Sequence, residues 1–313
     1  GVLNAHHRFS TAFLDLPRPE PAPPLSLVAQ SGVFQVGPEE FIGTLGKSVD
    51  IGNTADLDTV DCLEYLQDDP QSKVVALYLE GIHRGAQLGQ AVARTAARKP
   101  VVVLKSGRSG AGAEAALSHT GSLVGEDAVV DAAFARAGAV RVPNNVAFRA
   151  ACRALQHFHR MSGPRVGVVT CTGAAGIMGA DACEDYGLAL APFPPALREA
   201  LTLPRMAWHR LGNPADIWPV AMGSGDYIDF LKRTVAGWLA DDQVDGLMCV
   251  LVCKDSELHA DHDLVAAAQD MAADNPQGKP IALWLYGSGA PRQTRAINAL
   301  GLPGVAAFDT LDT

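Results

Sequence analysis

The sequence lacks any run of basic residues, any apolar stretch long enough to cross a membrane, and any CxxC pair. Its formal net charge of −9 gives no positive field for a polyphosphate backbone, so we expect no nucleic-acid partner. No apolar run approaches the roughly 18 residues of a membrane span, and no signal peptide is evident. We therefore predict no membrane association and a cytoplasmic location.

The cysteines also argue against two kinds of stabilising site. Most of them lie inside apolar runs, and their spacing matches neither a disulfide framework nor a metal cluster. We expect buried, reduced thiols and no bound metal. The six residues are Cys62, Cys152, Cys171, Cys183, Cys249 and Cys253.

What the sequence does contain is typical of a globular α/β protein. Of its 313 residues, 48% are hydrophobic and 19% are charged, which is sufficient for a sizeable core. The length exceeds that of one ordinary core and indicates about two domains.

Residues 1–24 have a different character from the rest. Prolines crowd residues 17–24, and such a segment forms neither a helix nor a central strand. The chain opens with Gly1 instead of an initiator Met. We predict that 1–24 is a linker and that an N-terminal domain preceded it.

From Leu25 onward, short apolar runs alternate with amphipathic segments, a pattern that predicts parallel sheets covered by helices on both faces. The pattern breaks at 161–164 and then restarts, so we predict two doubly wound domains, 25–160 and 164–313. The expected strands are 25–30, 48–51, 74–79, 101–105, 139–142, 166–171, 246–252 and 281–286. The expected helices are 59–67, 85–98, 126–137, 147–159, 175–186, 195–201, 227–239, 264–273 and 291–300.

Ligands of such sheets collect where strands end and helices begin, because free N–H groups and the helix dipole favour anions there. Three glycine-containing turns occupy such places: 30–34, 105–122 and 170–176. The middle one, rich in Gly, Ala and Ser, is long for a strand-to-helix connection, and we expect 106–122 to form a functional loop.

His119 lies near the end of that segment, between Ser118 and Thr120, small residues that would leave its ring accessible. Taken by itself, a lone histidine is more often solvated or structural than catalytic. Lys105 and Arg108, at the start of the segment, could counter the charge of a phosphate or be solvated; we favour solvation.

The sequence resembles the nucleoside-diphosphate-forming acyl-CoA synthetases, the family of succinyl-CoA synthetase. The resemblance rests chiefly on 99–108 leading into 118–123. The resemblance is reinforced by four further segments, which occur along the chain in the same order as in the family: 51–56, 63–66, 78–82 and 212–216. It implies two flavodoxin-like (succinyl-CoA synthetase-like) domains and a ligase that couples nucleotide triphosphate cleavage to acyl-CoA formation through an acyl phosphate and a phosphohistidine.

By this resemblance His119 is the phosphorylated histidine, and Glu80 is the acceptor that holds its other ring nitrogen. On the residues alone, Glu80 is equally an exposed strand-end carboxylate. The resemblance assigns phosphate binding to Ser31, Gly32, Thr172, Gly173, Ala174, Ser118, Thr120 and Gly121. It places Asn213 and Asp216 at the active site as substrate or structural residues, whereas the residues alone indicate a turn.

One departure weakens part of this assignment. Gly37 and Pro38 should interrupt a helix that begins after Gly32, so the first phosphate-directed helix is expected to start near Pro38. This puts Ser31 and Gly32 in doubt as ligands.

The complete family system uses CoA and ATP (or GTP) with Mg, a CoA-binding domain, an ATP-grasp domain or subunit, and a small carboxylic acid. We expect none of these ligands to bind tightly to this chain by itself, and a homodimer is possible. One alternative is the synthetase-like regulatory domain of a protein-lysine acetyltransferase, which tends to lack the histidine. Another is a flavodoxin-like module, whose bound flavin or nucleotide would be visible by absorbance.

Overall fold

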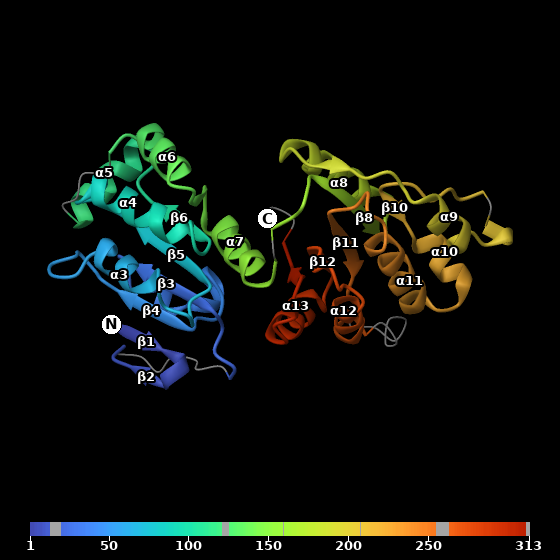
Figure 1. Ribbon diagram of the computed structural model, residues 1–313, viewed down its shortest axis with the longest axis horizontal. Coiled ribbons are helices and arrows are strands. Elements are labelled where there is room, and N and C mark those ends of the chain that lie inside the picture. The colour runs from blue at the N-terminus through green and yellow to red at the C-terminus, as the bar shows by residue number, and fades with distance from the viewer. Residues whose placement is uncertain (13–19, 121–124, 159, 207, 255–262, 311–313) are drawn as a thin grey trace. The chain divides into compact units, whose positions relative to one another are not determined.

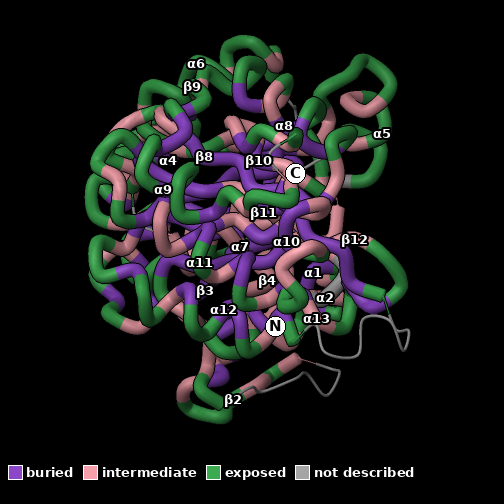
Figure 2. The backbone as a smooth tube through the Cα atoms, turned by 90° about the vertical axis from the view of Figure 1, so that its right-hand side faces the viewer, coloured by how far each residue is buried: buried purple, intermediate pink, exposed green. Residues whose placement is uncertain are grey.

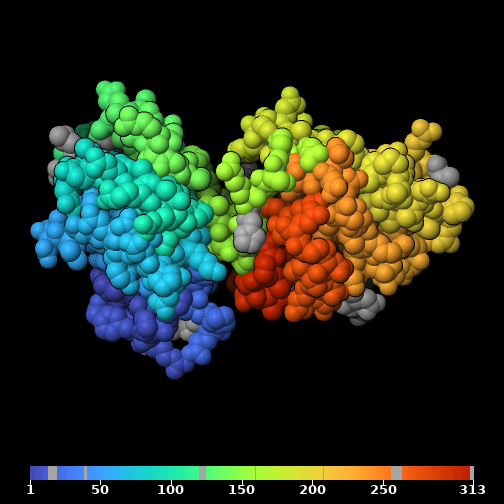
Figure 3. Space-filling view, in the orientation of Figure 1, coloured from blue at the N-terminus to red at the C-terminus, as the bar shows by residue number. Residues whose placement is uncertain are grey.

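The structure is a computed structural model that describes residues 1–12, 20–120, 125–158, 160–206, 208–254 and 263–310. The chain divides into two compact units, Gly1–Gln156 and His157–Leu311. In the space-filling view, the blue-to-green residues of unit 1 and the yellow-to-red residues of unit 2 each gather into a body of their own (Figure 3). Each unit is an α/β fold, as predicted, and is described by itself.

Unit 1 contains a seven-stranded sheet with the order β2-β1-β4-β3-β5-β6-β7 (Figure 1). Five of these strands are parallel neighbours: β4 (Lys47–Asp50), β3 (Leu25–Ala29), β5 (Val74–Leu79), β6 (Val101–Lys105) and β7 (Val140–Val142). In chain order they read 2-1-3-4-5, the flavodoxin-like order. The carboxyl ends of β3 and β5 adjoin at the point where the strand order reverses.

Helices cover both faces of this sheet, because successive strand residues point to opposite sides. Leu27 and Ala29 of β3 pack in one core with Phe34 and Phe148, whereas Val28 packs on the other face. The first face carries α1 (Val33–Val36), α2 (Pro38–Phe41) and α7 (Asn145–His157). The second carries α3 (Thr59–Leu66), α4 (Gly85–Ala96) and α6 (Asp127–Arg136).

The prediction that 1–24 is a linker is wrong for its first part. Two strands, β1 (Val2–Asn4) and β2 (Phe9–Ser10), flank the 3-10 turn η1 (Ala5–His7), and β1 pairs antiparallel with β4. The side chain of Leu3 enters the first core. Strands this short carry too few residues to show an alternating pattern, so composition alone could not identify them.

Unit 2 is built on a six-stranded sheet with the path β10-β8-β11-β12-β13, and β9 also pairs with β8. The strands are β8 (Arg165–Thr170), β9 (Ala189–Leu190), β10 (Ala215–Asp216), β11 (Gly246–Val252), β12 (Ile281–Tyr286) and β13 (Val305–Phe308). All of their pairings are parallel. Because β9 and β10 share one edge of β8, unit 2 repeats the 2-1-3-4-5 order of unit 1.

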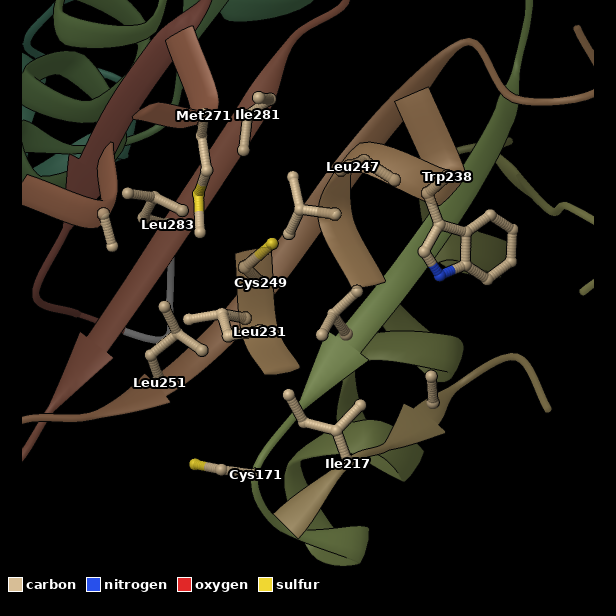
Figure 4. Packing of buried hydrophobic residues seen from close by; sticks show 14 of the residues in the cluster. Cys171, Ile217, Leu231, Trp238, Leu247, Cys249, Leu251, Met271, Ile281 and Leu283 are labelled. Atoms are coloured by element: carbon tan, nitrogen blue, oxygen red, sulfur yellow. The ribbon is translucent and has the colours of Figure 1, made fainter. Parts of the chain in front are cut away.

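The larger core of unit 2 lies between this sheet and α11 (Tyr227–Leu239) and α12 (Leu264–Ala273). Figure 4 shows Leu231 and Trp238 of α11 and Met271 of α12 gathered with Cys249 and Leu251 of β11. Gly167 of β8 makes room for the indole, since a Cβ there would lie 3.0 Å from the ring of Trp238. The other helices of unit 2 are α8 (Gly173–Asp185), α9 (Pro195–Leu201), α10 (Trp218–Ser224), α13 (Ala290–Ala299) and the 3-10 turn η2 (Pro204–Met206).

The central strands are the most deeply buried segments of the chain, and the exposed backbone lies mainly in loops and outer helix faces (Figure 2). All six cysteines are buried, as predicted, and none forms a disulfide bond with another described residue. None of the helices in the described ranges combines the length and the apolar character that crossing a membrane requires.

Candidate functional site

The carboxyl ends of β3 and β5 are joined by a side chain. Gln30 follows β3, and its Oε1 accepts hydrogen bonds from the main-chain N–H groups of Glu80 (2.5 Å) and Gly81 (3.0 Å), which follow β5. Gln30 and Glu80 are each only 9% exposed. The alternative that Glu80 is an exposed strand-end carboxylate is therefore wrong.

Lys105, the last residue of β6, is buried beside them. Its Nζ donates to the carbonyl oxygens of Glu80 (2.8 Å) and Ser106 (2.6 Å), and the residue is 2% exposed. Burial, reinforced by the charge of Arg141 and opposed by Asp127 and Glu80, lowers the pKa of Lys105 to about 8. Our expectation of a solvated Lys105 is wrong.

Arg108 does remain accessible, with 45% of its side chain exposed. Its Nε lies 3.4 Å from Asp127 Oδ2, and its Nη1 donates to the carbonyl of Pro143 at 3.1 Å. The Asp127 carboxylate also pairs with Arg141, which holds the pKa of Asp127 below its usual range. Arg108 therefore has a local anionic partner already.

An open cavity of about 510 Å³ lies at the carboxyl ends of β5, β6 and β7. Its lining includes Tyr78, Lys105, Ser106, Arg108 and Asp127. Burial raises the pKa of the Tyr78 phenol, so the phenol stays protonated at neutral pH. The cavity lies at the carboxyl edge of the sheet, the edge at which open parallel sheets bind ligands, beside the switch point between β3 and β5.

His119 lies on a helix, which corrects the prediction of a loop over 106–122. Helix α5 spans Gly110–Thr120, and the alanines at 111, 113, 115 and 116 favour it. The absence of apolar periodicity had hidden it, because outward-facing small residues show no helical pattern. Both Ser118 and His119 are exposed, and in the described part of the chain the imidazole makes no hydrogen bond or ion pair.

The structure does not bring all the predicted residues of this segment to one place. No hydrogen bond joins His119 to Glu80 among the described residues. Thr120 ends α5, and Gly121 lies outside the described residues.

In unit 1 the predicted phosphate turn is followed by only a short helix. Gly32 is the N-cap residue of α1, which has four residues, and α2 restarts with Pro38 in its first turn. The predicted interruption at Gly37 and Pro38 is confirmed, but helical structure begins directly after Gly32 and not first at Pro38. A Cβ on Gly32 would lie 3.1 Å from Asp50 Oδ2, at the end of β4.

In unit 2 the corresponding turn leads into a full helix. Thr172 is the N-cap residue of the thirteen-residue α8, and Gly173 and Ala174 are exposed in its first turn. A Cβ on Gly173 would lie 3.5 Å from Asp216 Oδ2, at the end of β10. Each unit thus places an aspartate from the neighbouring strand beside the glycine at the helix start.

Asn213 completes an edge of the second sheet. Its Nδ2 donates to the carbonyls of Val166 and Ala191, both at 2.8 Å, and its Oδ1 accepts from the N–H of Val168 at 2.9 Å. The side-chain amide thereby fills the gap between β9 and β10 along β8. Of the two roles that the sequence left open for Asn213, these contacts support the structural one.

Gln30 was missed as a candidate, and Lys105 was considered only as a counter-charge for phosphate or a solvated residue. Each is a polar residue at the end of an apolar strand, and this was the available signal. No group of three or more His, Cys, Asp or Glu side chains in the described ranges could hold a metal ion.

Comparisons with known proteins agree with this architecture. Residues 22–155 match the succinyl-CoA ligase like flavodoxin domain. The chain is 31% identical over 315 residues to subunit alpha of the ADP-forming acetate–CoA ligase II of Pyrococcus furiosus, covering 97% of the chain and 65% of that subunit. The chain is thus similar to the ADP-forming acetate–CoA ligases along nearly its whole length.

Two further synthetases of this family extend the comparison. The ADP-forming acetate–CoA ligase II of Archaeoglobus fulgidus is 29% identical over 324 residues, and the chain spans 47% of its length. The chain also matches a solved structure, that of the dinucleotide-forming acetyl-coenzyme A synthetase 1 of Ca. Korarchaeum cryptofilum in complex with phosphate and ADP. The match covers all of this chain and 66% of the synthetase chain, with a TM-score of 0.83 and 27% sequence identity. The fold of both units is therefore that of an acyl-CoA synthetase.

Proposed function

We propose that this chain is the part of an NDP-forming acyl-CoA ligase that carries a transiently phosphorylated histidine, His119. The single observation that carries the proposal is the exposure of the His119 imidazole on α5, in a chain that is similar to the synthetases of this family. An imidazole enclosed in hydrocarbon could not exchange a phosphoryl group with ligands in other parts of an enzyme.

The proposed chemistry needs a neutral imidazole. A ring nitrogen attacks the phosphorus of an acyl phosphate or of the nucleotide's terminal phosphate, and the P–O bond to the leaving carboxylate or nucleoside diphosphate breaks. The phosphohistidine then passes its phosphoryl group to the other of these two acceptors, the carboxylate or the nucleoside diphosphate. The thiol of CoA attacks the acyl carbon of the acyl phosphate, and the C–O bond breaks with release of inorganic phosphate. Histidine suits this role because its neutral form is abundant near pH 7.

Glu80 is proposed to accept a hydrogen bond from the other ring nitrogen when α5 brings His119 to it. Such an acceptor fixes the tautomer and stabilises the positive charge that develops on the ring. Its support is the burial of Glu80 and the fixing of its main chain by Gln30 and Lys105. A fixed carboxylate loses little freedom when it receives the ring.

The start of α8 is proposed as a phosphate site of the second unit. Thr172, Gly173 and Ala174 begin a helix of thirteen residues, and the free N–H groups of its first turn with the helix dipole favour an anion. In unit 1, Ser31 and Gly32 have weaker support, because the four residues of α1 give a smaller dipole. Ser118, Thr120 and Gly121 are proposed to contact the phosphoryl group as neighbours of His119.

The complete reaction requires partners. We propose that the chain acts with a CoA-binding domain and an ATP-grasp domain or subunit, on a small carboxylic acid, with CoA, ATP or GTP, and Mg as ligands of the complete enzyme. The cytoplasm remains the proposed location, and a homodimer remains possible. By itself the chain is expected to form no acyl-CoA.

The test is phosphorylation by acetyl phosphate, which supplies the phosphoryl group without a nucleotide. We expect the protein to gain one alkali-stable, acid-labile phosphate, and the His119→Ala variant to gain none. His7→Ala, which removes another exposed histidine of unit 1, is the matched control and should behave as the parent does. A phosphate that persists in His119→Ala would refute the assignment.

A further inference from the structure

We propose that Lys105 is a positioning residue of the phosphohistidine site. It holds Glu80 in place relative to Ser106, the first residue of the segment that leads to His119. The inference rests on the proposed function of His119 and Glu80. In this proposal Lys105 makes no contact with substrate. It acts through its hydrogen bonds to the main chain of Glu80 and Ser106.

The geometry of Glu80 is the first support. Both polar atoms of its main chain are held by side chains from neighbouring strands: its N–H donates to Gln30, beyond β3, and its carbonyl accepts from Lys105 at the end of β6. Since these bonds replace ladder pairing at the strand end, the direction in which the Glu80 side chain leaves the sheet depends on them.

The second support is the other bond of Lys105. Its ammonium also donates to the carbonyl of Ser106, the first residue after β6, and the Ser106 N–H donates to the carbonyl of Leu79 at 2.9 Å. Ser106 begins the connection that leads to α5 and His119. The buried ammonium of Lys105 thus links Glu80, the proposed acceptor of the His119 ring, to Ser106, where the segment that carries His119 begins.

The third support is the unfavourable free energy of burying a cation at position 105. Among the described residues no carboxylate forms a salt bridge with Lys105, although its residue exposure is only 2%. Residues 101–104 of the same strand are all apolar, and an unbranched apolar side chain would fill the space without desolvating a charge. The lysine is explained instead by its charge-assisted hydrogen bonds to the carbonyls of Glu80 and Ser106, which an apolar side chain would leave without this donor.

Burial is the main cause of the lowered pKa of Lys105, and charged groups on the surrounding elements modify it. Arg141 of β7 repels the ammonium, while Asp127 of α6 and the carboxylate of Glu80, after β5, attract it. Tyr78 of β5 and Arg108 after β6 line the same cavity. The lowered pKa of Lys105 places its deprotonation just above neutral pH, where the bonds to the two carbonyls lose their charge assistance.

The test compares Lys105→Met with the parent, using phosphoramidate as the phosphoryl donor and peptide mass spectrometry to follow phosphate on His119 from pH 6 to 10. The parent rate should fall as pH passes about 8, where Lys105 loses its proton. The variant should be slower by roughly ten- to a hundredfold at pH 7, as expected for loss of a charge-assisted bond, and should lack the fall. Lys73→Met, which alters an exposed lysine beside β5, should leave rate and profile unchanged.

A parallel profile in Lys105→Met, whether equally fast or uniformly slower, would overturn the positioning role, because a purely structural lysine would change no pH dependence. If Lys105→Met does not fold, the pH profiles of the parent and of Lys105→Gln provide the test. A parent rate that stays flat through pH 8 would refute the proposal. A Lys105→Gln rate that still falls above pH 8 would refute it too. Absence of phosphate on His119 in the parent would instead refute the proposed function.

Discussion

Gln30 and Glu80, fifty residues apart in sequence, meet through a hydrogen bond of 2.5 Å between the Gln30 side-chain oxygen and the Glu80 N–H. The same oxygen accepts the N–H of Gly81 at 3.0 Å, so one side chain closes the switch point of the first sheet. Replacing it leaves two buried donors without an acceptor.

We predict that Gln30→Ala lowers the free energy of unfolding by about 1–3 kcal/mol, since each orphaned donor forfeits its hydrogen bond. Urea denaturation followed by circular dichroism measures this change. The variant should also slow phosphorylation of His119, since Glu80 loses one of its two main-chain anchors. An unfolding free energy equal to that of the parent would contradict the importance of this bond.

The stability of the protein should depend on pH through Lys105. Its folded-state pKa of about 8 lies below the ordinary value of 10.5, so between these values the unfolded chain binds more protons than the folded one. Stability contributed by this residue therefore rises with pH in that window, by at most about 1.4 kcal/mol per pH unit. The unfolding free energy of the parent relative to Lys105→Met, measured in urea from pH 7 to 10, should increase above pH 8. A constant difference would contradict the lowered pKa.

Asn213 should matter for stability of unit 2. Asn213→Ala removes three hydrogen bonds to the edge of β8 and its neighbour, and we predict a loss of about 1–3 kcal/mol. Asn213→Asp keeps the acceptor for Val168 but loses both donors, so it should be destabilising as well. Thermal unfolding of the two variants measures both effects, and an aspartate variant as stable as the parent would argue against the role of the donors.

The pair of Arg165 and Asp245 should make unit 2 sensitive to acid. Asp245 has 3% of its side chain exposed and accepts from the Arg165 Nε and main-chain N–H, both at 2.9 Å, and from Ser162 at 2.9 Å. The Arg165 guanidinium, more than any other cause, holds the pKa of Asp245 well below its usual range despite burial. Its stabilisation is therefore fully present above about pH 4 and lost as pH falls toward the folded-state pKa.

We predict that Asp245→Ala destabilises the protein by about 3 kcal/mol at pH 7, because a buried pair loses one partner. Compared with the parent, this deficit should shrink as the pH is lowered from 4.5 to 2. Unfolding of both proteins in guanidinium chloride at each pH measures this difference. A deficit that does not change with pH would mean that the carboxylate is not the stabilising form.

Much of the fold could be predicted from sequence because its strands are continuous apolar runs. The predicted ranges 74–79, 101–105, 246–252 and 281–286 coincide with β5, β6, β11 and β12. Several missed elements lack such a signal: β1 and β10 are three and two residues long, and α5 has no apolar face. β13 (VAAF) is a short apolar run that was also missed. Strands this short form through pairing that a local pattern does not encode.

The candidate site was only partly predictable, for a different reason. His119 and Glu80 were proposed as site residues only through the resemblance to the synthetase family. The surroundings of Glu80 depend on contacts between residues 50 and 25 positions apart, to Gln30 and to Lys105. Solvent exposure is the ordinary state of a lysine, so its burial at the end of β6 had to come from the three-dimensional structure.

The most direct test of the account is to locate the phosphate. After reaction with acetyl phosphate, digestion and mass spectrometry under alkaline conditions should find one phosphoryl group, on the peptide that contains His119 and on its imidazole. Glu80→Gln should reduce its yield, and His119→Ala should abolish it while the protein remains folded by circular dichroism. A phosphoryl group located on another residue, or undiminished in His119→Ala, would contradict the central claim.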